Sequence, residues 1–582
     1  MLIEYSNLND ERKIFLNREL ADILYLCRKQ KIPIPEINLS IIDSTNTCEL
    51  HQEIKTKIKI SAKPGIQNPD NFLDFCEQEK NLQTSQSILN NNILWIIGTG
   101  AEGAIYGFYN AIKKITGVKW YGISDSDIGF TSQSDLIETI HRPKFPFRGV
   151  WFTPSQGKHN FANKFLKWMV RNGWNLININ AWGWDKYPFK NEFIKMCDIF
   201  GIKLAVGYRE IEFFLPDLFF QGNLNNKMSP CYSNPQFLDK LADGILDFVE
   251  NHPEIDILSL QSYDESNNRC QCDGCLKKTP YEAMYMLGLE IKERIKRFLP
   301  IEILCPDIFS MPYKILPISN NTYTLLVVPQ NQDKFNETIS NIPETKYSDA
   351  GSINFSDKMD YCHIINNGWL PYLGKIGSAI GICYHYQDIF HTYPGKNNRR
   401  RYLDSPNHKI IEDEINKFAE MGISVFYDCS LPFCGFWPDE ACYSYLGSLL
   451  WENSQNADKT VAEYYRAIGG ERAEVLMNIL KNIKTKTEIT PSVFETAKSI
   501  FRNLSASHSC RYLLWLDYIQ LVRQSQRALQ NHDTETMVEK EKQIIVFFEK
   551  NRDILEEYID IDYMINYSKA LINFYSKEEE NK

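Results

Sequence analysis

Between about residues 144 and 451 the sequence alternates short apolar runs with amphipathic runs, and this alternation constrains the fold more than any other feature. A short apolar run bounded by turn residues is typical of a buried parallel strand, and an amphipathic run is typical of a helix that covers it. Eight strands are predicted, at residues 145–152, 174–182, 202–209, 255–263, 301–308, 323–329, 378–386 and 424–428. Eight strand and helix units in about 300 residues predict an α/β fold, a (β/α)8 TIM barrel.

The segments on either side of the predicted barrel have different patterns. An apolar strand at 93–97 is followed by a helix, which indicates a separate α/β unit before the barrel. After residue 453 the apolar residues recur at helical spacing, in segments such as 464–483, 512–529 and 544–558. We therefore expect three domains: an N-terminal α/β domain over 1–140, the (β/α)8 barrel over 141–452, and a C-terminal helical domain over 453–582.

Charge and cysteine content limit the partners and the compartment. The formal net charge of −10 opposes binding to a phosphate backbone, so we expect no nucleic-acid partner. No run approaches the ~18 apolar residues of a membrane span, and the amino terminus has no apolar run of signal-peptide length. Fifteen cysteines, an odd number, are typical of reduced thiols in a chain without a signal. These features predict a cytoplasmic protein with no membrane partner.

A glycine-rich turn at Gly98, Gly100 and Gly103 lies between a predicted strand and a predicted helix, where a dinucleotide-binding motif would stand. A nucleotide-binding strand opens its own domain, however, and here about 90 residues precede it. We therefore interpret these glycines as a tight turn that lets the helix approach the sheet.

The predicted fourth strand is followed by a carboxylate pair, Asp264 and Glu265. In a TIM barrel the chemistry takes place at the carboxyl ends of the strands, so the residues after each apolar run are the candidates for a site. Glycoside hydrolysis needs one protonated carboxyl group and a second group that supports the oxocarbenium-like centre. The pair is the predicted catalytic centre, and a solvated acidic loop is the other interpretation that the residues leave open.

The ends of the other predicted strands combine aromatic side chains with hydrogen-bonding groups. A pyranose ring has an apolar face and a polar rim, so this mixture is typical of a carbohydrate site. The residues predicted to bind substrate are Arg148, Trp151, Asn180, Trp182, Tyr208, Arg209, Glu210, Tyr384, His385, Tyr386, Tyr427 and Trp437.

Three cysteines, Cys270, Cys272 and Cys275, lie close together after the fourth strand. A tetrahedral zinc site needs one further ligand, for which Cys231 and Cys305 are candidates. Two interpretations remain, a structural zinc site or reduced thiols that shape the loop. No cofactor is expected for catalysis.

Several segments resemble known families of carbohydrate-active proteins. The stretch 95–112 with 117–121 resembles the N-terminal domain that precedes the barrel in α-glucuronidases and β-hexosaminidases, where the glycines serve packing. Segments 231–235, 259–264 with the three cysteines, and 449–453 resemble the uncharacterised-domain family numbered 4838. That group includes glycoside hydrolase family 163, endo-β-N-acetylglucosaminidases acting on N-glycans. The resemblance covers residues 90–470 in outline and implies a barrel that acts on glycans.

Asp264 matches the strand-four aspartate of this family, and two other positions depart from its pattern. Glu265 stands where relatives carry glycine and forms an Asp-Glu pair similar to that of the β-hexosaminidases. In those enzymes the aspartate orients the substrate acetamido group and the glutamate is the acid. His385 stands where relatives carry a glutamate between two tyrosines. The resemblance thus leaves the substrate and the identity of the acid open, and Glu210 is the next candidate for the acid.

The resemblance and the carboxylate pair together predict a retaining, acetamido-assisted β-N-acetylhexosaminidase, exo or endo, that acts on an oligosaccharide or glycoconjugate. Two alternatives stay open. A hydrolase of the α-glucuronidase type would use Arg148 or Arg209 to bind a sugar carboxylate. A non-catalytic carbohydrate-binding protein on a degenerate barrel would account for His385 in place of a glutamate.

Overall fold

The structure of the chain is a computed structural model. It describes residues 3–6, 8–34, 38–43, 85–90, 93–98, 100–124, 127–131, 139–152, 159–208, 211–214, 231–261, 272–305, 312, 314–319, 321–328, 361–384, 408–428, 440–451, 457–485, 490–504, 506–556, 558–559 and 561–580. Each of the eight predicted barrel segments contains a described strand.

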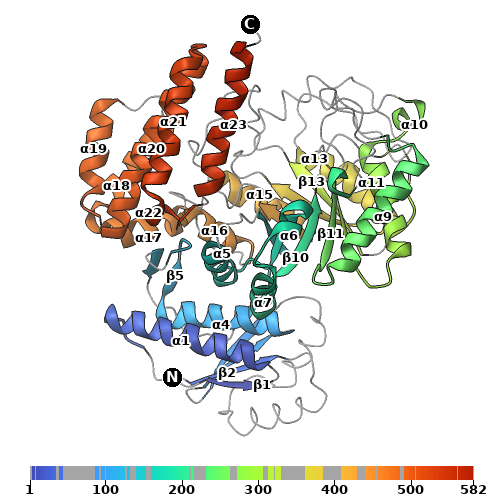
Figure 1. The fold of residues 1–582 in the computed structure, drawn as a ribbon. Coiled ribbons are helices and arrows are strands. Elements are labelled where there is room, and N and C mark those ends of the chain that lie inside the picture. Colours follow the sequence, from blue (N-terminus) through green and yellow to red (C-terminus); the bar gives the residue numbers. More distant parts are fainter. Residues whose placement is uncertain are drawn as a thin grey trace.

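The first part of the chain forms a five-stranded sheet of order β1-β2-β4-β3-β7. Strands β1, β2 and β4 are parallel, while β3 is antiparallel to β4 and to β7. Helices α1 and α4 lie together over one face of this sheet (Figure 1). The elements are β1 (Ile3–Ser6), α1 (Asp10–Lys29), β2 (Asn38–Asp43), β3 (Ser85–Asn90), β4 (Ile93–Gly98), α4 (Gly100–Thr116) and β7 (Thr139–His141), with a small ribbon of β5 (Val118–Trp120) and β6 (Ile128–Phe130).

Gly98 ends β4 directly against the first turn of α4. A Cβ atom at this position would lie 1.9 Å from the backbone nitrogen of Ala104, so a larger residue would push the helix away. The glycine therefore serves a tight strand-to-helix turn, in agreement with the interpretation drawn from the sequence.

Eight parallel strands close into a barrel in which every strand pairs with its neighbours in chain order and the eighth pairs with the first. This confirms the predicted (β/α)8 TIM barrel. The strands are β8 (Phe147–Phe152), β9 (Leu176–Asn180), β10 (Lys203–Tyr208), β11 (Ile257–Gln261), β12 (Ile301–Cys305), β13 (Thr322–Val328), β14 (Ala379–Tyr384) and β15 (Val425–Asp428).

Helices pack around the outside of the barrel, and the longer ones have an apolar stripe that faces the strands. Phe161, Phe165, Trp168 and Met169 of α5 are all buried, as their spacing predicted. The helices around the barrel are α5 (His159–Arg171), α6 (Ala181–Lys186), α7 (Lys190–Phe200), α8 (Ile211–Phe214), α9 (Pro235–Asn251), α10 (Asp273–Leu276), α11 (Pro280–Arg294), α13 (Tyr361–Ile364), the π-helical turn η4 (Ile365–Trp369), α14 (Leu370–Ile376), α15 (His408–Glu420) and α16 (Glu440–Leu449).

The ends of α9 follow from local chemistry. The side chain of Asn234 accepts a hydrogen bond from the backbone nitrogen of Gln236, and Pro235 occupies the first turn. At the other end His252 is the C-cap, immediately before Pro253. Because α9 runs back along the barrel, its amino end lies at the carboxyl ends of the strands.

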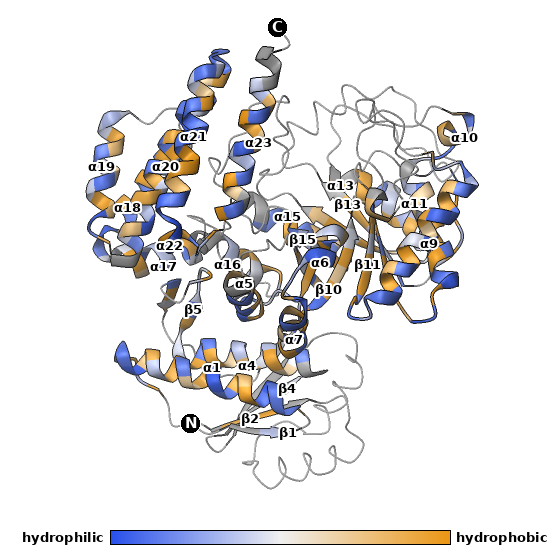
Figure 2. Ribbon diagram, viewed as in Figure 1, coloured by the Kyte–Doolittle hydropathy of each residue, from blue (hydrophilic) through white to orange (hydrophobic). Residues whose placement is uncertain are grey.

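The last part of the chain is helical. Its elements are α17 (Ala457–Gly469), the 3₁₀ turn η5 (Gly470–Arg472), α18 (Ala473–Thr485), α19 (Pro491–Phe501), α20 (Ala506–Gln530), α21 (Thr534–Lys550), α22 (Arg552–Leu555) and α23 (Ile561–Glu580). The segment 464–483, for which helical spacing was predicted, is helical but is interrupted at Gly470, whose φ of 53° lies in the left-handed region. Hydrophobic and hydrophilic residues alternate along α19, α20 and α21 (Figure 2), as expected for helices that pack on one side.

Buried charges join these parts to one another. Glu19 of α1 accepts hydrogen bonds from Arg171 of α5 and forms an ion pair with Lys167, at 2.5 Å. Arg511 of α20 donates to Asp127, which lies just before β6. Within the described residues, no helix is long and apolar enough to cross a membrane.

Candidate active site

The inner face of the barrel is lined by alternate residues of each strand. In β12, Ile301, Ile303 and Cys305 pack in the outer core against helices, whereas Leu304 belongs to a separate cluster inside the barrel. Since successive side chains of a strand point to opposite faces, Glu302 shares the inner face with Leu304. An ionisable residue thus stands inside a strand that otherwise reads Ile-Ile-Leu-Cys.

The Glu302 carboxyl group is fully buried and forms hydrogen bonds with side chains from three other strands. Tyr427 of β15 donates its hydroxyl to Oε1 at 2.6 Å, and Asn178 of β9 donates to Oε2 at 3.4 Å. Burial raises the pKa of Glu302 to about 7, although hydrogen bonds with Tyr427, Ser259 and Asn178 oppose this shift. The centre of the barrel therefore holds a carboxyl group that is easily protonated near neutral pH.

Space for the Tyr427 ring comes from a glycine on the neighbouring strand. Gly149 of β8 is the register partner of Tyr427, and a Cβ atom there would lie 2.3 Å from Cε1 of the ring. The glycine is required by packing, and the ring it admits carries the hydroxyl that binds Glu302.

Three polar or aromatic side chains lie on the inner face toward the carboxyl ends of their strands. Trp151 packs beside the inner cluster, and Asn180 and Gln261 are the last residues of β9 and β11. The carboxyl end of the barrel therefore combines an indole with amides, the mixture that suits a sugar ring.

Two of the residues predicted to bind substrate lie at the end of β9 and just beyond it. The Oδ1 atom of Asn180 accepts a hydrogen bond from the backbone nitrogen of Gly183, at 2.8 Å, and so caps α6. Trp182 follows on α6 with 48% of its surface exposed, and Nζ of Lys186 lies 4.3 Å from its ring centre. The indole of Trp182 is therefore held next to a capped helix start with much of its surface open to a ligand.

Arg148 was predicted to bind substrate, and the structure contradicts this prediction. Its guanidinium is fully buried at the opposite end of the barrel, where it donates to the backbone carbonyl groups of Phe145, Pro146 and Gly173. These carbonyl groups all precede strands, and the guanidinium also lies 4.7 Å from the centre of the Trp451 ring. The side chain of Arg148 therefore stabilises the amino end of the barrel, away from the carboxyl ends of the strands where the sequence predicted it. The prediction was wrong because the residue begins its strand and does not end it.

Tyr427 was predicted to bind substrate and instead makes an internal contact. The side chain is fully buried and its hydroxyl is bonded to Glu302. Sequence reasoning missed Glu302 itself because it searched the residues that follow each strand. An acidic residue at an inward position of an apolar strand was the signal that could have found it.

The remaining predicted residues, or their side chains, lie outside the described part of the chain. Tyr208 and Tyr384 end β10 and β14, but their side chains lie outside the described part of the chain. The same holds for the whole of Asp264, Glu265, Arg209, Glu210, His385, Tyr386, Trp437 and Cys270. These assignments stay predictions.

Two of the three predicted metal ligands are described, and a third cysteine joins them. The thiols of Cys231, Cys272 and Cys275 lie within 4.8 Å of one another. Cys305, the other candidate for this set, is buried in the core between the strands and the outer helices. Cys231 is therefore the residue that the fold brings to the predicted pair.

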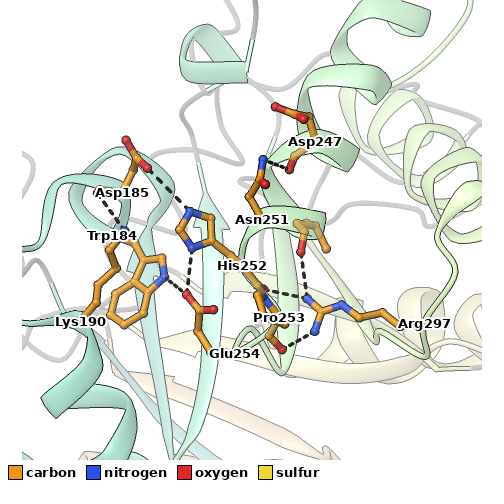
Figure 3. Close-up of polar contacts among 10 residues, drawn as sticks. Trp184, Asp185, Lys190, Asp247, Asn251, His252, Pro253, Glu254 and Arg297 are labelled. Atoms are coloured by element: carbon orange, nitrogen blue, oxygen red, sulfur yellow. Dashed lines mark hydrogen bonds and ion pairs between the residues drawn. The ribbon is translucent and has the colours of Figure 1, made fainter.

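A second polar cluster lies at the amino end of the barrel, in the turn from α9 to β11 (Figure 3). Glu254 accepts a hydrogen bond from Nε1 of Trp184 and contacts Nδ1 of His252, both at 2.9 Å. Burial raises the pKa of Glu254, but hydrogen bonds with its own backbone, His252 and Trp184 outweigh burial and lower it. Arg297 donates to the carbonyl groups of His252 and Pro253 and so caps α9. This cluster holds together the turn that precedes β11, at the end of the barrel opposite the carboxyl ends of the strands.

No protein-family model matches the chain, and no curated protein matches it by sequence. Among solved structures it is similar to a GH138 enzyme targeting pectin rhamnogalacturonan II, with 10% identity, a TM-score of 0.49, and coverage of 96% of this chain and 74% of that one. For CpGH84B the identity is 10%, the TM-score 0.44, and the coverage 97% and 96%. A family 89 glycoside hydrolase from Clostridium perfringens, in complex with 2-acetamido-1,2-dideoxynojirmycin, has 12% identity, a TM-score of 0.47, and coverage of 88% and 67%.

Proposed function

We propose that this chain is a glycoside hydrolase whose substrate, an oligosaccharide or glycoconjugate, binds at the carboxyl end of the barrel. One observation carries the proposal. In the closed barrel β11 ends at Gln261, so the Asp264-Glu265 pair follows the carboxyl end of a barrel strand within four residues. That is the position from which TIM-barrel enzymes supply their catalytic groups.

The side chains at the same end of the barrel support a carbohydrate substrate. Trp151, Asn180 and Gln261 supply an aromatic face and hydrogen-bonding groups on the inner wall. Sugar sites combine these two kinds of group because the C–H face of a pyranose packs on an aromatic ring while its hydroxyl groups need polar partners.

For the reaction itself we infer acetamido-assisted cleavage of a β-N-acetylhexosaminide with retention of configuration. Asp264 would orient the acetamido group so that its oxygen attacks the anomeric carbon, and Glu265 would protonate the departing oxygen. Glu302 is not assigned as the acid, because its carboxyl group is fully buried and accepts hydrogen bonds from Tyr427 and Asn178.

The position of Arg148 weakens the alternative hypothesis of a uronidase-like hydrolase. It relied on Arg148 or Arg209 to bind a sugar carboxylate, and the Arg148 guanidinium is committed to backbone carbonyl groups at the far end of the barrel. A screen of chromogenic N-acetylhexosaminides and uronides distinguishes the two activities, and hydrolysis of uronides alone would overturn the proposal.

The role of Glu265 is tested with substrates of different leaving-group quality. We expect Glu265→Gln to lower turnover about 10²-fold or more on substrates with poor leaving groups, because positioned proton donation contributes about 10²–10⁴-fold. Aryl glycosides with activated leaving groups should lose much less, since they depart without a proton. Turnover is compared with that of Asp239→Asn, which alters an exposed carboxylate on α9.

The role of Asp264 predicts a different pattern. Asp264→Asn should slow activated and unactivated substrates alike, because the acetamido oxygen attacks the anomeric carbon in the same step in which the leaving group departs, whatever that group is. Unchanged cleavage of natural-type glycans by Glu265→Gln would move the acid to another residue, with Glu210 the next candidate. Full activity in both variants would rule out the site after β11.

A further inference from the structure

Three cysteines from two distant parts of the sequence meet at the carboxyl side of the barrel. Cys231 precedes α9, while Cys272 and Cys275 lie at the start of α10 and within it. The Sγ atom of Cys231 lies 3.7 Å from that of Cys272 and 3.8 Å from that of Cys275. All three sulfur atoms lie within 4.8 Å of one another.

These distances match thiols that share a metal ion and do not match a disulfide. A disulfide would bring two sulfur atoms to about 2.05 Å, and the structure holds all three residues as thiols. Two thiolates at about 2.3 Å from a tetrahedral zinc ion are separated by about 3.8 Å. The separations of the Cys231 sulfur from those of Cys272 and Cys275 have this length.

The local backbone places the two thiols of the α10 turn on one side. Cys272 is the N-cap of α10, and its Sγ atom accepts a hydrogen bond from the backbone nitrogen of Cys275 at 3.4 Å. Gly274 lets the segment before α9 approach, because a Cβ atom there would lie 2.6 Å from Cβ of Ser233. The Cys-X-X-Cys spacing brings two thiols together, and Gly274 allows the segment that contains Cys231 to approach them.

Burial of apolar surface does not explain the cluster. Cys275 is buried, but Cys231 is half-buried and Cys272 is exposed. Thiols that gather only to shape a loop are normally buried as small hydrophobic side chains. Three thiols that lie this close together and are only partly buried are better explained as ligands of one structural metal ion.

We propose that Cys231, Cys272 and Cys275 supply three thiolate ligands to a structural zinc ion, with a fourth ligand completing the tetrahedron. The ion joins the amino end of α9 to the turn that leads into α11. Residues 262–271, which carry Asp264 and Glu265, lie between β11 and Cys272, so the ion anchors one end of the segment that holds the proposed catalytic pair. Zinc here contributes stability and takes no part in bond cleavage.

Elemental analysis of the full-length protein tests the site directly. After incubation with zinc chloride and desalting, we expect about one zinc ion per chain, and less than about a tenth in Cys231→Ser and in Cys272→Ser. Cys510→Ser, which changes a half-buried cysteine of α20, should keep the full metal content. Zinc below about a tenth of an equivalent in the unchanged protein would overturn the proposal, as would full zinc content in Cys231→Ser.

Cobalt substitution keeps the test valid if a cysteine variant fails to fold. Bound to the unchanged protein, Co²⁺ in a tetrahedral thiolate site gives a sulfur-to-metal charge-transfer band and intense visible bands. An octahedral, thiolate-free spectrum, or a Cys231–Cys272 disulfide found by mass spectrometry of the native protein, would contradict the site. These readouts do not depend on glycosidase activity, so the metal site and the proposed function can fail separately.

Discussion

At the scale of single residues, the inner face of the barrel contains a buried carboxyl group, that of Glu302. Glu302 is fully buried and receives the Tyr427 hydroxyl at 2.6 Å. Ionisation would create a negative charge in the protein interior, with no cationic partner among these contacts, so burial raises its pKa to about 7. The protonation state of this residue therefore changes within the physiological range.

The raised pKa predicts a specific pH dependence of stability. In the unfolded chain the group ionises near 4.5, but the folded protein keeps its proton up to about pH 7. Stability from this group is thus present below pH 4.5 and is lost as the pH rises toward 7, by about 3 kcal/mol at most. Glu302→Gln should abolish this loss, so the variant gains stability relative to the unchanged protein between pH 5 and pH 8. Urea unfolding at a series of pH values measures the difference.

Glu293→Gln is the control for this prediction, because Glu293 is an exposed carboxylate on the neighbouring helix α11. Its effect on the free energy of unfolding should vary little with pH. A stability difference between Glu302→Gln and the unchanged protein that is the same at pH 5 and pH 8 would mean that Glu302 does not titrate in this range.

At the scale of secondary structure elements, the contact between β8 and β15 depends on a glycine, Gly149. Gly149 and Tyr427 are register partners, and the ring occupies the volume that a Cβ atom on Gly149 would need. Close-packed interiors cannot absorb such an atom without moving the ring or the strand. The seam where the first and last strands close the barrel is therefore sensitive to a single methyl group.

Gly149→Ala should destabilise the protein by about 1–3 kcal/mol, because overpacking forces the Tyr427 ring out of place. Gly374→Ala is the matched control, since a Cβ atom on that glycine of α14 would meet nothing within 4 Å. Combining Gly149→Ala with Tyr427→Leu should cost less than the sum of the two single changes, because the leucine leaves room for the methyl group. Thermal and chemical unfolding measure these effects. Equal stability of the two alanine variants would refute the steric argument.

At the scale of the whole molecule, buried charge pairs connect parts of the chain that are distant in sequence. Asp127 and Arg511 are both fully buried, and the Arg511 guanidinium also lies 4.8 Å from the centre of the Tyr558 ring. Burial raises the pKa of Asp127, but Arg511 and His508 outweigh burial and lower it. The pair ties the C-terminal helices to the segment before β6.

Arg511→Met should destabilise the protein by about 3–5 kcal/mol, because it leaves the Asp127 carboxylate buried without its main partner. The half-exposed pair of Arg552 and Asp562 is the control, and Arg552→Met should cost less than about 1 kcal/mol. In the unchanged protein the contribution of Asp127 is lost as the pH falls below its ordinary value of 3.8, and the Arg511 variant should lack this loss. Equal unfolding midpoints for the two variants would show that the buried pair contributes no more than the surface pair.

The sequence alone determined the local features of this chain. The eight apolar runs became the eight barrel strands, because a strand buried on both faces needs a continuous apolar run. The limits of α9 follow from Asn234, Pro235 and His252, which act on backbone groups a few residues away. The family 163 resemblance and the residues outside the described ranges stay predictions.

The tertiary structure alone decided which residues meet. Arg148 was expected at a carbohydrate site and lies at the opposite end of the barrel, while Glu302 was overlooked and lies at its centre. Cys231 joins Cys272 from 41 positions away, and nothing in the sequence favoured it over Cys305. The physical reason is the same for Arg148, Glu302 and Cys231. Periodicity records which side of a strand or helix is apolar, whereas distances across the barrel depend on the register of eight strands and the paths of their connections.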